Sequence, residues 1–136
     1  MHASQDVRDA MIRFCEAFTS NDVGVFEGTI TAEPDAGVIG TGPAERYEGR
    51  TNWIDAYAQQ IAAIPGIALT AGDPSGFEEG GIGWAADQPT FVLPDGTPVP
   101  VRLTAVLRRE SDEWKMVHAH FSMGVPDDLL EAVLTA

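Results

Sequence analysis

The segment that most restricts the fold of this chain is Trp114-Lys115-Met116-Val117-His118-Ala119-His120-Phe121-Ser122. In a β-strand, successive side chains point to opposite faces, so residues 114–123 divide into two sets. One set is Trp114, Met116, His118, His120 and Ser122, and the other is Lys115, Val117, Ala119, Phe121 and Met123. Both sets contain bulky apolar side chains, so both faces must be covered. We therefore predict a strand in the middle of a sheet.

The size and charge of the chain exclude several classes of function. With 136 residues, the chain suits one domain, residues 1–136, that is large enough to bury a core. Its 21 acidic and 8 basic residues give a formal net charge of −13. This argues against binding to nucleic acids or membranes, because phosphate contacts need clustered lysine and arginine. The first residues lack the basic start and apolar run of a signal peptide, so we predict a cytoplasmic protein.

The order of the predicted elements indicates an α+β fold. Ser4 is a predicted N-cap for a helix with apolar residues at helical spacing up to Phe18, and Asp22 for a short second helix. Thr51 is the predicted cap of a third helix that ends at Pro65-Gly66. The predicted strands cover Val38–Ile39 and residues 67–72, 79–89, 99–109 and 114–123, and a short helix follows Asp127. Helices followed by an antiparallel meander predict helices packed on one face of a curved sheet, around a conical cavity.

Two motifs resemble one known family. The segment 114–122 is similar to the tryptophan-x-x-valine-histidine-x-histidine-x-serine ending of the association (hub) domain of calcium/calmodulin-dependent protein kinase II. The segment 40–50, Gly-Thr-Gly-Pro-Ala-Glu-Arg-Tyr-Glu-Gly-Arg, looks like the segment before the third helix of bacterial SnoaL-like proteins. The chain thus resembles the NTF2-like superfamily and, within it, SnoaL-like proteins related to the hub.

The resemblance implies a cone-shaped barrel with a cystatin-like α+β fold, one ligand-binding pocket per subunit and a homodimer formed through the outer face of the sheet. The superfamily includes isomerases, dehydratases, epoxide hydrolases, polyketide cyclases and binding modules without catalysis. Because one fold serves all of these, the resemblance predicts no particular reaction. We predict no cofactor and no metal.

A hairpin turn at 110–113 predicts which side chains face the pocket. It pairs Arg109 with Trp114 and Thr104 with Ala119, although a slip of one residue would exchange the two faces. The predicted pocket residues are Trp53, Tyr57, Trp84, Gln88, Arg102, Thr104 and Phe121. Arg102 is the only strong cation among them, so the pocket would suit a small hydrophobic molecule, including a carboxylate. The set contains no acid or histidine, which argues against proton transfer.

His118 and His120 have two interpretations. On the predicted register both lie on the outer face, where we expect them to contact a partner subunit. A slip would turn them inward, where either one could be the catalytic base of an isomerase, polyketide cyclase or dehydratase that acts on a hydrophobic carbonyl compound. A third possibility is a module whose function is oligomerisation itself. We favour small-molecule binding.

Three further side chains are weighed in the same way. Glu45 is either an acid or base at the pocket mouth or, in the interpretation we favour, a solvated carboxylate or a partner of Arg50. Asp87 lies in the middle of a predicted strand, and we expect it to point outward as an edge or interface charge. Cys15, the single cysteine, lies on an apolar helical stripe and is predicted to be a buried structural thiol.

Overall fold

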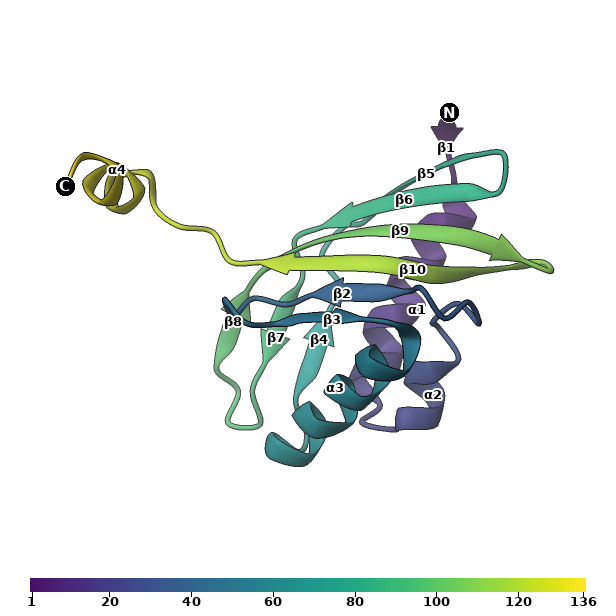
Figure 1. Cartoon of the computed structure of the whole chain (residues 1–136), viewed down its shortest axis with the longest axis horizontal. Coiled ribbons are helices and arrows are strands. Elements are labelled where there is room, and N and C mark those ends of the chain that lie inside the picture. Colours follow the sequence, from purple (N-terminus) through teal and green to yellow (C-terminus); the bar gives the residue numbers. More distant parts are fainter.

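Three helices lie along one side of a curved sheet, and a fourth projects away from the body (Figure 1). The structure is a computed structural model that describes all residues, 1–136. The helices are α1 (Gln5–Thr19), α2 (Val23–Glu27), α3 (Arg50–Ala63) and α4 (Asp127–Thr135). The strands are β1 (His2–Ala3), β2 (Gly37–Ile39), β3 (Arg46–Glu48), β4 (Ala68–Thr70), β5 (Ser75–Glu79), β6 (Ile82–Asp87), β7 (Thr90–Val92), β8 (Pro98–Pro100), β9 (Arg102–Glu110) and β10 (Glu113–Ser122). The predicted α+β class is confirmed.

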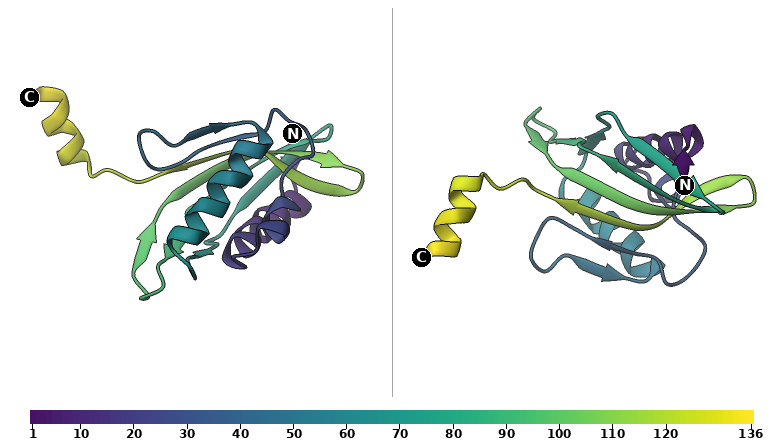
Figure 2. Two further views of the ribbon diagram at one scale, coloured as in Figure 1. Left: turned by 60° about the horizontal axis from the view of Figure 1, so that its bottom comes forward. Right: turned by 90° about the horizontal axis from the view of Figure 1, so that it is seen from above.

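The strands form two sheets that curve around the helices (Figure 2). The larger sheet has seven strands in the order β1-β5-β6-β9-β10-β2-β3, and the smaller has three in the order β4-β7-β8. The hairpin of β9 and β10 lies at the centre of the larger sheet, as the apolar character of the last strand predicted. β2 runs parallel to β10, a pairing that a simple meander does not contain.

Helix capping follows the sequence for two of the three packed helices. The Ser4 hydroxyl accepts a hydrogen bond from the N–H of Val7 at 3.2 Å, and the Asp22 carboxylate accepts one from Gly24 at 2.9 Å. Both predicted caps are therefore confirmed. The predicted Thr51 cap is wrong: the N-cap of α3 is Gly49, two residues earlier, whose φ of 95° favours glycine.

One predicted strand is a hairpin. The predicted strand 79–89 starts at the last residue of β5. The chain then turns at Gly80 and Gly81 (φ 61° and 95°) and continues as β6. Two consecutive glycines with positive φ make a tight connection that other residues would strain, so the chain reverses there. β6 then pairs with β9 and completes the centre of the sheet.

A β-bulge in β10 changes the predicted hairpin register. Trp114 pairs with Arg109 and Met116 with Leu107, as expected, but His118 pairs with Val106, which leaves Val117 as an extra residue. From His118 onward, the predicted pairing with β9 is therefore wrong by one residue. The bulge also puts Trp114 and Met116 on the same buried face as Ala119 and Phe121, against the predicted alternation.

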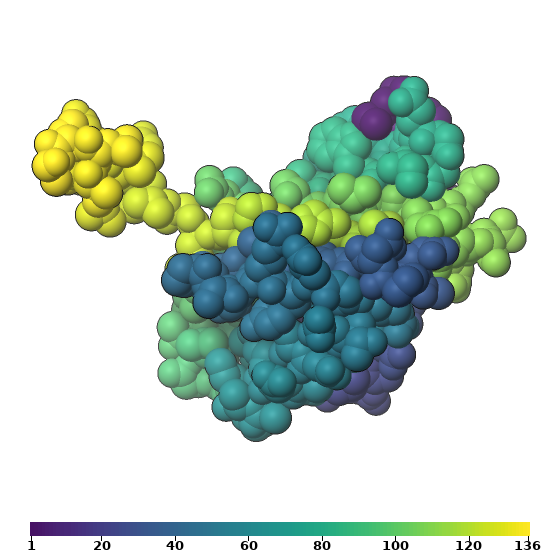
Figure 3. All heavy atoms as spheres, in the orientation of Figure 1, coloured from purple at the N-terminus to yellow at the C-terminus, as the bar shows by residue number.

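The core lies between this buried face and the helices. Val7, Met11 and Phe14 of α1 are at most 1% exposed, and they belong to the same apolar cluster as Leu103 and Leu107 of β9. α4 takes no part in this core, and its apolar side chains are all exposed (Figures 1 and 3). None of the helices has the length and apolarity needed to cross a bilayer.

Candidate functional site

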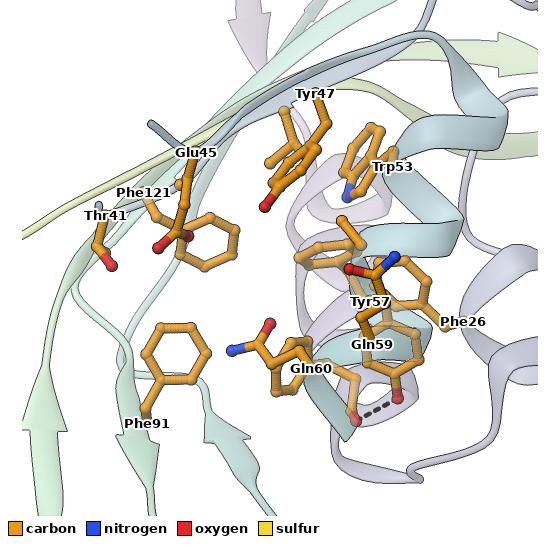
Figure 4. Close-up of a pocket in the computed structure, with 15 residues that line it drawn as sticks. Phe26, Thr41, Glu45, Tyr47, Trp53, Tyr57, Gln59, Gln60, Phe91 and Phe121 are labelled. Atoms are coloured by element: carbon orange, nitrogen blue, oxygen red, sulfur yellow. Dashed lines mark hydrogen bonds between the residues drawn. The ribbon is translucent and has the colours of Figure 1, made fainter. Parts of the chain in front are cut away.

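A cavity of about 340 Å³ opens between α3, the segment 40–47 and the buried face of the sheet (Figure 4). Fifteen residues line it: Phe14, Phe18, Phe26, Val38, Gly40, Thr41, Glu45, Tyr47, Trp53, Ala56, Tyr57, Gln59, Gln60, Phe91 and Phe121. Its volume is at the lower end of the range for pockets that hold small organic molecules. Eight of the fifteen side chains are aromatic, so most of the wall is apolar.

The aromatic wall is held in place by its own packing. The rings of Phe26 and Tyr57 stack with centroids 3.9 Å apart, and those of Phe91 and Phe121 lie 5.6 Å apart. The Tyr57 hydroxyl donates a hydrogen bond to the carbonyl of Phe18 at 2.7 Å, at the end of α1. Burial raises the pKa of Tyr57 above its ordinary value. Tyr57 therefore contributes its ring to the cavity and uses its hydroxyl to join α3 to α1.

The polar groups gather toward the open side. Figure 4 shows the Glu45 carboxylate, the Tyr47 hydroxyl and the Gln60 amide directed into the same space. A tight loop positions Glu45: the N–H of Gly40 donates to the Glu45 carbonyl at 2.6 Å, and the N–H of Glu45 donates to the Gly42 carbonyl at 3.1 Å. Side chains at Gly40 or Gly42 would collide with the Glu45 side chain, so both glycines leave room for it.

Glu45 is the only charged side chain in the lining, which contains no lysine, arginine or histidine. The predicted pairing of Glu45 with Arg50 is wrong. Arg50 instead forms an ion pair with Glu27 at 3.0 Å and donates to the carbonyl of Thr31 at 2.8 Å. Those contacts hold Arg50 at the start of α3 and leave Glu45 at the mouth of the cavity.

Only three of the seven predicted pocket residues line the cavity. The structure brings Trp53, Tyr57 and Phe121 together around the cavity. The predicted placement of Trp84, Gln88, Arg102 and Thr104 in the pocket is wrong, since all four are exposed and none lines the cavity. The bulge is the reason: with Val117 unpaired, Ala119 and Phe121 face inward beside Ala105 and Leu103 rather than beside Thr104 and Arg102. Arg102 donates to the Ser122 hydroxyl at 3.1 Å, away from the cavity.

Both histidines lie on the outer face of the sheet. The ring Nδ1 of His118 is 2.9 Å from the carbonyl oxygen of Gly37 on β2, while His120 is exposed and pairs with Thr104. Neither lines the cavity, so the alternative in which His118 or His120 acts as a base inside it is wrong.

Asp87 and Cys15 are both buried. Asp87 is 8% exposed, so its predicted outward orientation is wrong, and its carboxylate accepts hydrogen bonds from the N–H groups of Gly72, Asp73 and Gln88 at 2.8–2.9 Å. Cys15 is 1% exposed. Burial, with a smaller contribution from the charge of Asp87, raises the pKa of the Cys15 thiol to about 12. Such a thiol is not a nucleophile at neutral pH.

The sequence analysis missed several lining residues, and the helical periodicity of α3 could have identified two of them, Ala56 and Gln60. Trp53, Ala56, Tyr57 and Gln60 recur at three- and four-residue spacing, which places them on one face of α3. Tyr47 and Thr41 had no comparable signal, because their placement depends on how the segment 40–47 folds over the sheet.

Comparisons with known proteins agree with this fold. Residues 7–126 match the model of the SnoaL-like domain family. None of the curated protein sequences compared with the chain matches it significantly. A protein of Streptomyces avermitilis, provisionally described as a dehydratase of the NTF2-like family, is similar in structure with a TM-score of 0.79 and 21% identity over 90% of this chain and 96% of its own.

Two other solved structures are similar. An NTF2-like protein of unknown function from Pseudomonas putida KT2440 has a TM-score of 0.77 and 14% identity over 90% of this chain and 87% of its own. A protein of Thiobacillus denitrificans, provisionally described as a calcium/calmodulin-dependent protein kinase type II association domain, has a TM-score of 0.71 and 20% identity over 85% and 93%, respectively. Identities this low support a shared fold only. The family model nevertheless spans most of the sequence, and so the chain belongs to the SnoaL-like domain family.

Proposed function

We propose that the protein binds a small, largely apolar molecule in the cavity between α3 and the sheet. The observation that carries this proposal is the aromatic wall, which is continuous with a polar rim at Glu45, Tyr47 and Gln60. Apolar walls supply binding free energy by removing ligand surface from water, and a few polar groups orient the ligand.

The size of the cavity supports the same proposal. A space of about 340 Å³ bounded by Phe14, Phe26 and Phe121 lies within the range of pockets that hold small organic molecules. A ligand in this space would remove the apolar surface of these rings from water, which supplies binding free energy.

Two leucine substitutions on α3 test the proposal. Ala56 lines the cavity, and Ala62 is exposed on the same helix outside it. We expect the neutral fluorophore phenylnaphthylamine to bind the unmodified protein saturably. Ala56→Leu should weaken this binding about tenfold or more, because the larger side chain fills part of the cavity, and Ala62→Leu should leave the affinity unchanged. Equal binding by all three proteins would contradict the cavity as the site. Native mass spectrometry of the purified protein would identify a retained ligand directly.

Proton transfer on a hydrophobic carbonyl compound is a second candidate, favoured by one observation. Glu45 and the Tyr47 hydroxyl face the same cavity, so a carboxylate that can accept a proton is near a phenol that can donate to an enolate oxygen. The test is exchange of the methyl protons of acetonaphthone in D₂O, followed by NMR. Acceleration that Glu45→Gln removes would support this activity, and the buffer rate throughout would contradict it.

We also propose that the outer face of the sheet binds a second copy of the chain. Ile82, Trp84 and Val106 are 39–53% exposed there, and the Trp84 ring stacks on Phe77 at 4.5 Å, so these side chains form an exposed apolar patch. Sedimentation equilibrium should report a dimer that Trp84→Glu dissociates, whereas Val25→Glu, at an exposed apolar position on α2, should leave the dimer intact. A monomeric unmodified protein would refute this proposal.

A further inference from the structure

We propose that the ligand of the cavity is an organic cation, an apolar body that carries an ammonium group. This inference rests on the proposed binding function and adds the chemical class of the ligand. It follows from the charge of the lining, from its aromatic character and from the field of the whole protein.

The first argument is the charge of the lining. Glu45 contributes the single formal charge, and no cationic side chain neutralises it within the cavity. The two arginines nearest to it in the sequence are engaged elsewhere: Arg46 pairs with Glu48 and Arg50 pairs with Glu27, each at 3.0 Å. The carboxylate of Glu45 is therefore available to a ligand, and its natural partner is a positive hydrogen-bond donor.

The second argument is the surroundings of that carboxylate. Phe91, Phe121 and Tyr47 line the same cavity as Glu45 (Figure 4). An ammonium group that leaves water for an apolar wall loses hydration, which is costly unless other groups replace it. Aromatic faces attract cations through their quadrupole, and the carboxylate adds a charge-assisted hydrogen bond. The lining therefore offers a cation both kinds of compensation.

The third argument concerns anions. The sequence predicted that Arg102 could pair with a ligand carboxylate, but Arg102 lies on the outer face. Inside the cavity an anionic ligand would meet Glu45 and no opposite charge. The formal net charge of −13 acts in the same direction, because it raises the local concentration of cations and lowers that of anions.

Three probes with one ring system separate charge from apolar binding: naphthylmethylamine, naphthylmethanol and naphthoate. Their affinities for the full chain are measured by isothermal titration at low ionic strength. We expect the amine to bind about fivefold to tenfold more tightly than the alcohol, and naphthoate to bind most weakly. Glu45→Gln should reduce the ratio of amine affinity to alcohol affinity about fivefold, because it removes the charge that the amine pairs with.

Asp55→Asn is the matched control, because Asp55 is an exposed acid on α3 outside the cavity and its loss changes the net charge equally. Equal loss of amine affinity in both variants would mean that the preference for the amine comes from the electrostatic field of the whole protein, and it would overturn the role of Glu45. Alcohol binding equal to amine binding would overturn the cation inference and leave the binding function standing. Failure of all three probes to bind would overturn both.

Discussion

Replacement of Asp87 should show that this carboxylate stabilises the fold. Its Oδ1 accepts hydrogen bonds from Asp73 at 2.9 Å and Gln88 at 2.8 Å, and its Oδ2 accepts one from Gly72 at 2.9 Å. These bonds fasten the turn before β5 to the end of β6. Because the acceptor is charged and only 8% exposed, each bond is expected to contribute about 1.5–3 kcal/mol.

Asparagine has the shape of aspartate but only one acceptor oxygen. In Asp87→Asn the amide group that replaces one oxygen would face a backbone N–H, so at least one bond is lost and the others are weakened. We expect the free energy of unfolding of Asp87→Asn to fall by about 2–3 kcal/mol. In Asp87→Ala all three bonds are lost, but Gly72 and Asp73 are exposed and their N–H groups can bind water instead, so we expect a loss of about 4 kcal/mol. At roughly 3 °C per kcal/mol, Asp87→Asn would lower Tm by about 6–9 °C.

The assay is urea unfolding followed by tryptophan fluorescence. Asp73→Asn is the control, because the Asp73 side chain is 94% exposed and pairs with Arg8 across 3.1 Å at the surface. A pair of that kind contributes less than about 1 kcal/mol. If Asp87→Asn unfolds within about 0.5 kcal/mol of the unmodified protein, the assignment of these backbone hydrogen bonds is refuted.

Three other variants test further features of the fold. Burial raises the pKa of the Cys15 thiol from about 8.5 in the unfolded chain to about 12 in the folded protein. This contribution to stability is fully present below pH 8.5 and falls by about 1.4 kcal/mol per pH unit between pH 8.5 and about 12; urea unfolding of Cys15→Ala at several pH values should lack this component of the slope. Tyr57→Phe removes the hydrogen bond to Phe18 and should cost about 1 kcal/mol by urea unfolding, and no change would mean that the bond is replaced. Phe121→Ala should cost about 3–5 kcal/mol, whereas deletion of Val117, the unpaired residue, should cost less, because it makes the pairing of β10 with β9 regular and keeps Phe121 on the buried face; a loss as large as that of Phe121→Ala in thermal unfolding would contradict this register.

Local patterns in the sequence predicted the parts of the fold that depend on local physics. The N-caps Ser4 and Asp22 are correct because capping joins a side chain to a backbone N–H two or three residues away. The central position of β10 is correct, but the reason for predicting it is not, because the bulge places Trp114, Met116 and Phe121 on one buried face rather than on both faces. The same alternation could not reveal which side each residue takes once one residue is unpaired.

The wrong placement of Arg102 and Thr104 in the pocket has one source, the bulge at Val117. Whether Val117 is skipped depends on the packing of Phe121 and Ala119 against α1 and α3, which are far from it in the sequence. That single residue shifts the partners of β10 on β9, and Arg102 and Thr104 then face outward. Glu45 lines the cavity, although the sequence favoured a solvated or Arg50-paired carboxylate over a place at the pocket mouth, because its orientation depends on the loop between Gly40 and Tyr47, for which the sequence contains no periodic signal.

The projecting helix α4 has a consequence for hydrogen exchange. It has nine residues, and Leu129, Leu130, Val133 and Leu134 are 47–75% exposed. A helix this short is marginal in water without tertiary contacts, so its amide hydrogens should exchange with deuterium almost as fast as those of an unfolded peptide. Any molecule that covers the apolar side of α4 would slow that exchange. The C-terminal amides thus provide a reporter of association that needs no substitution or dye and is independent of the cavity.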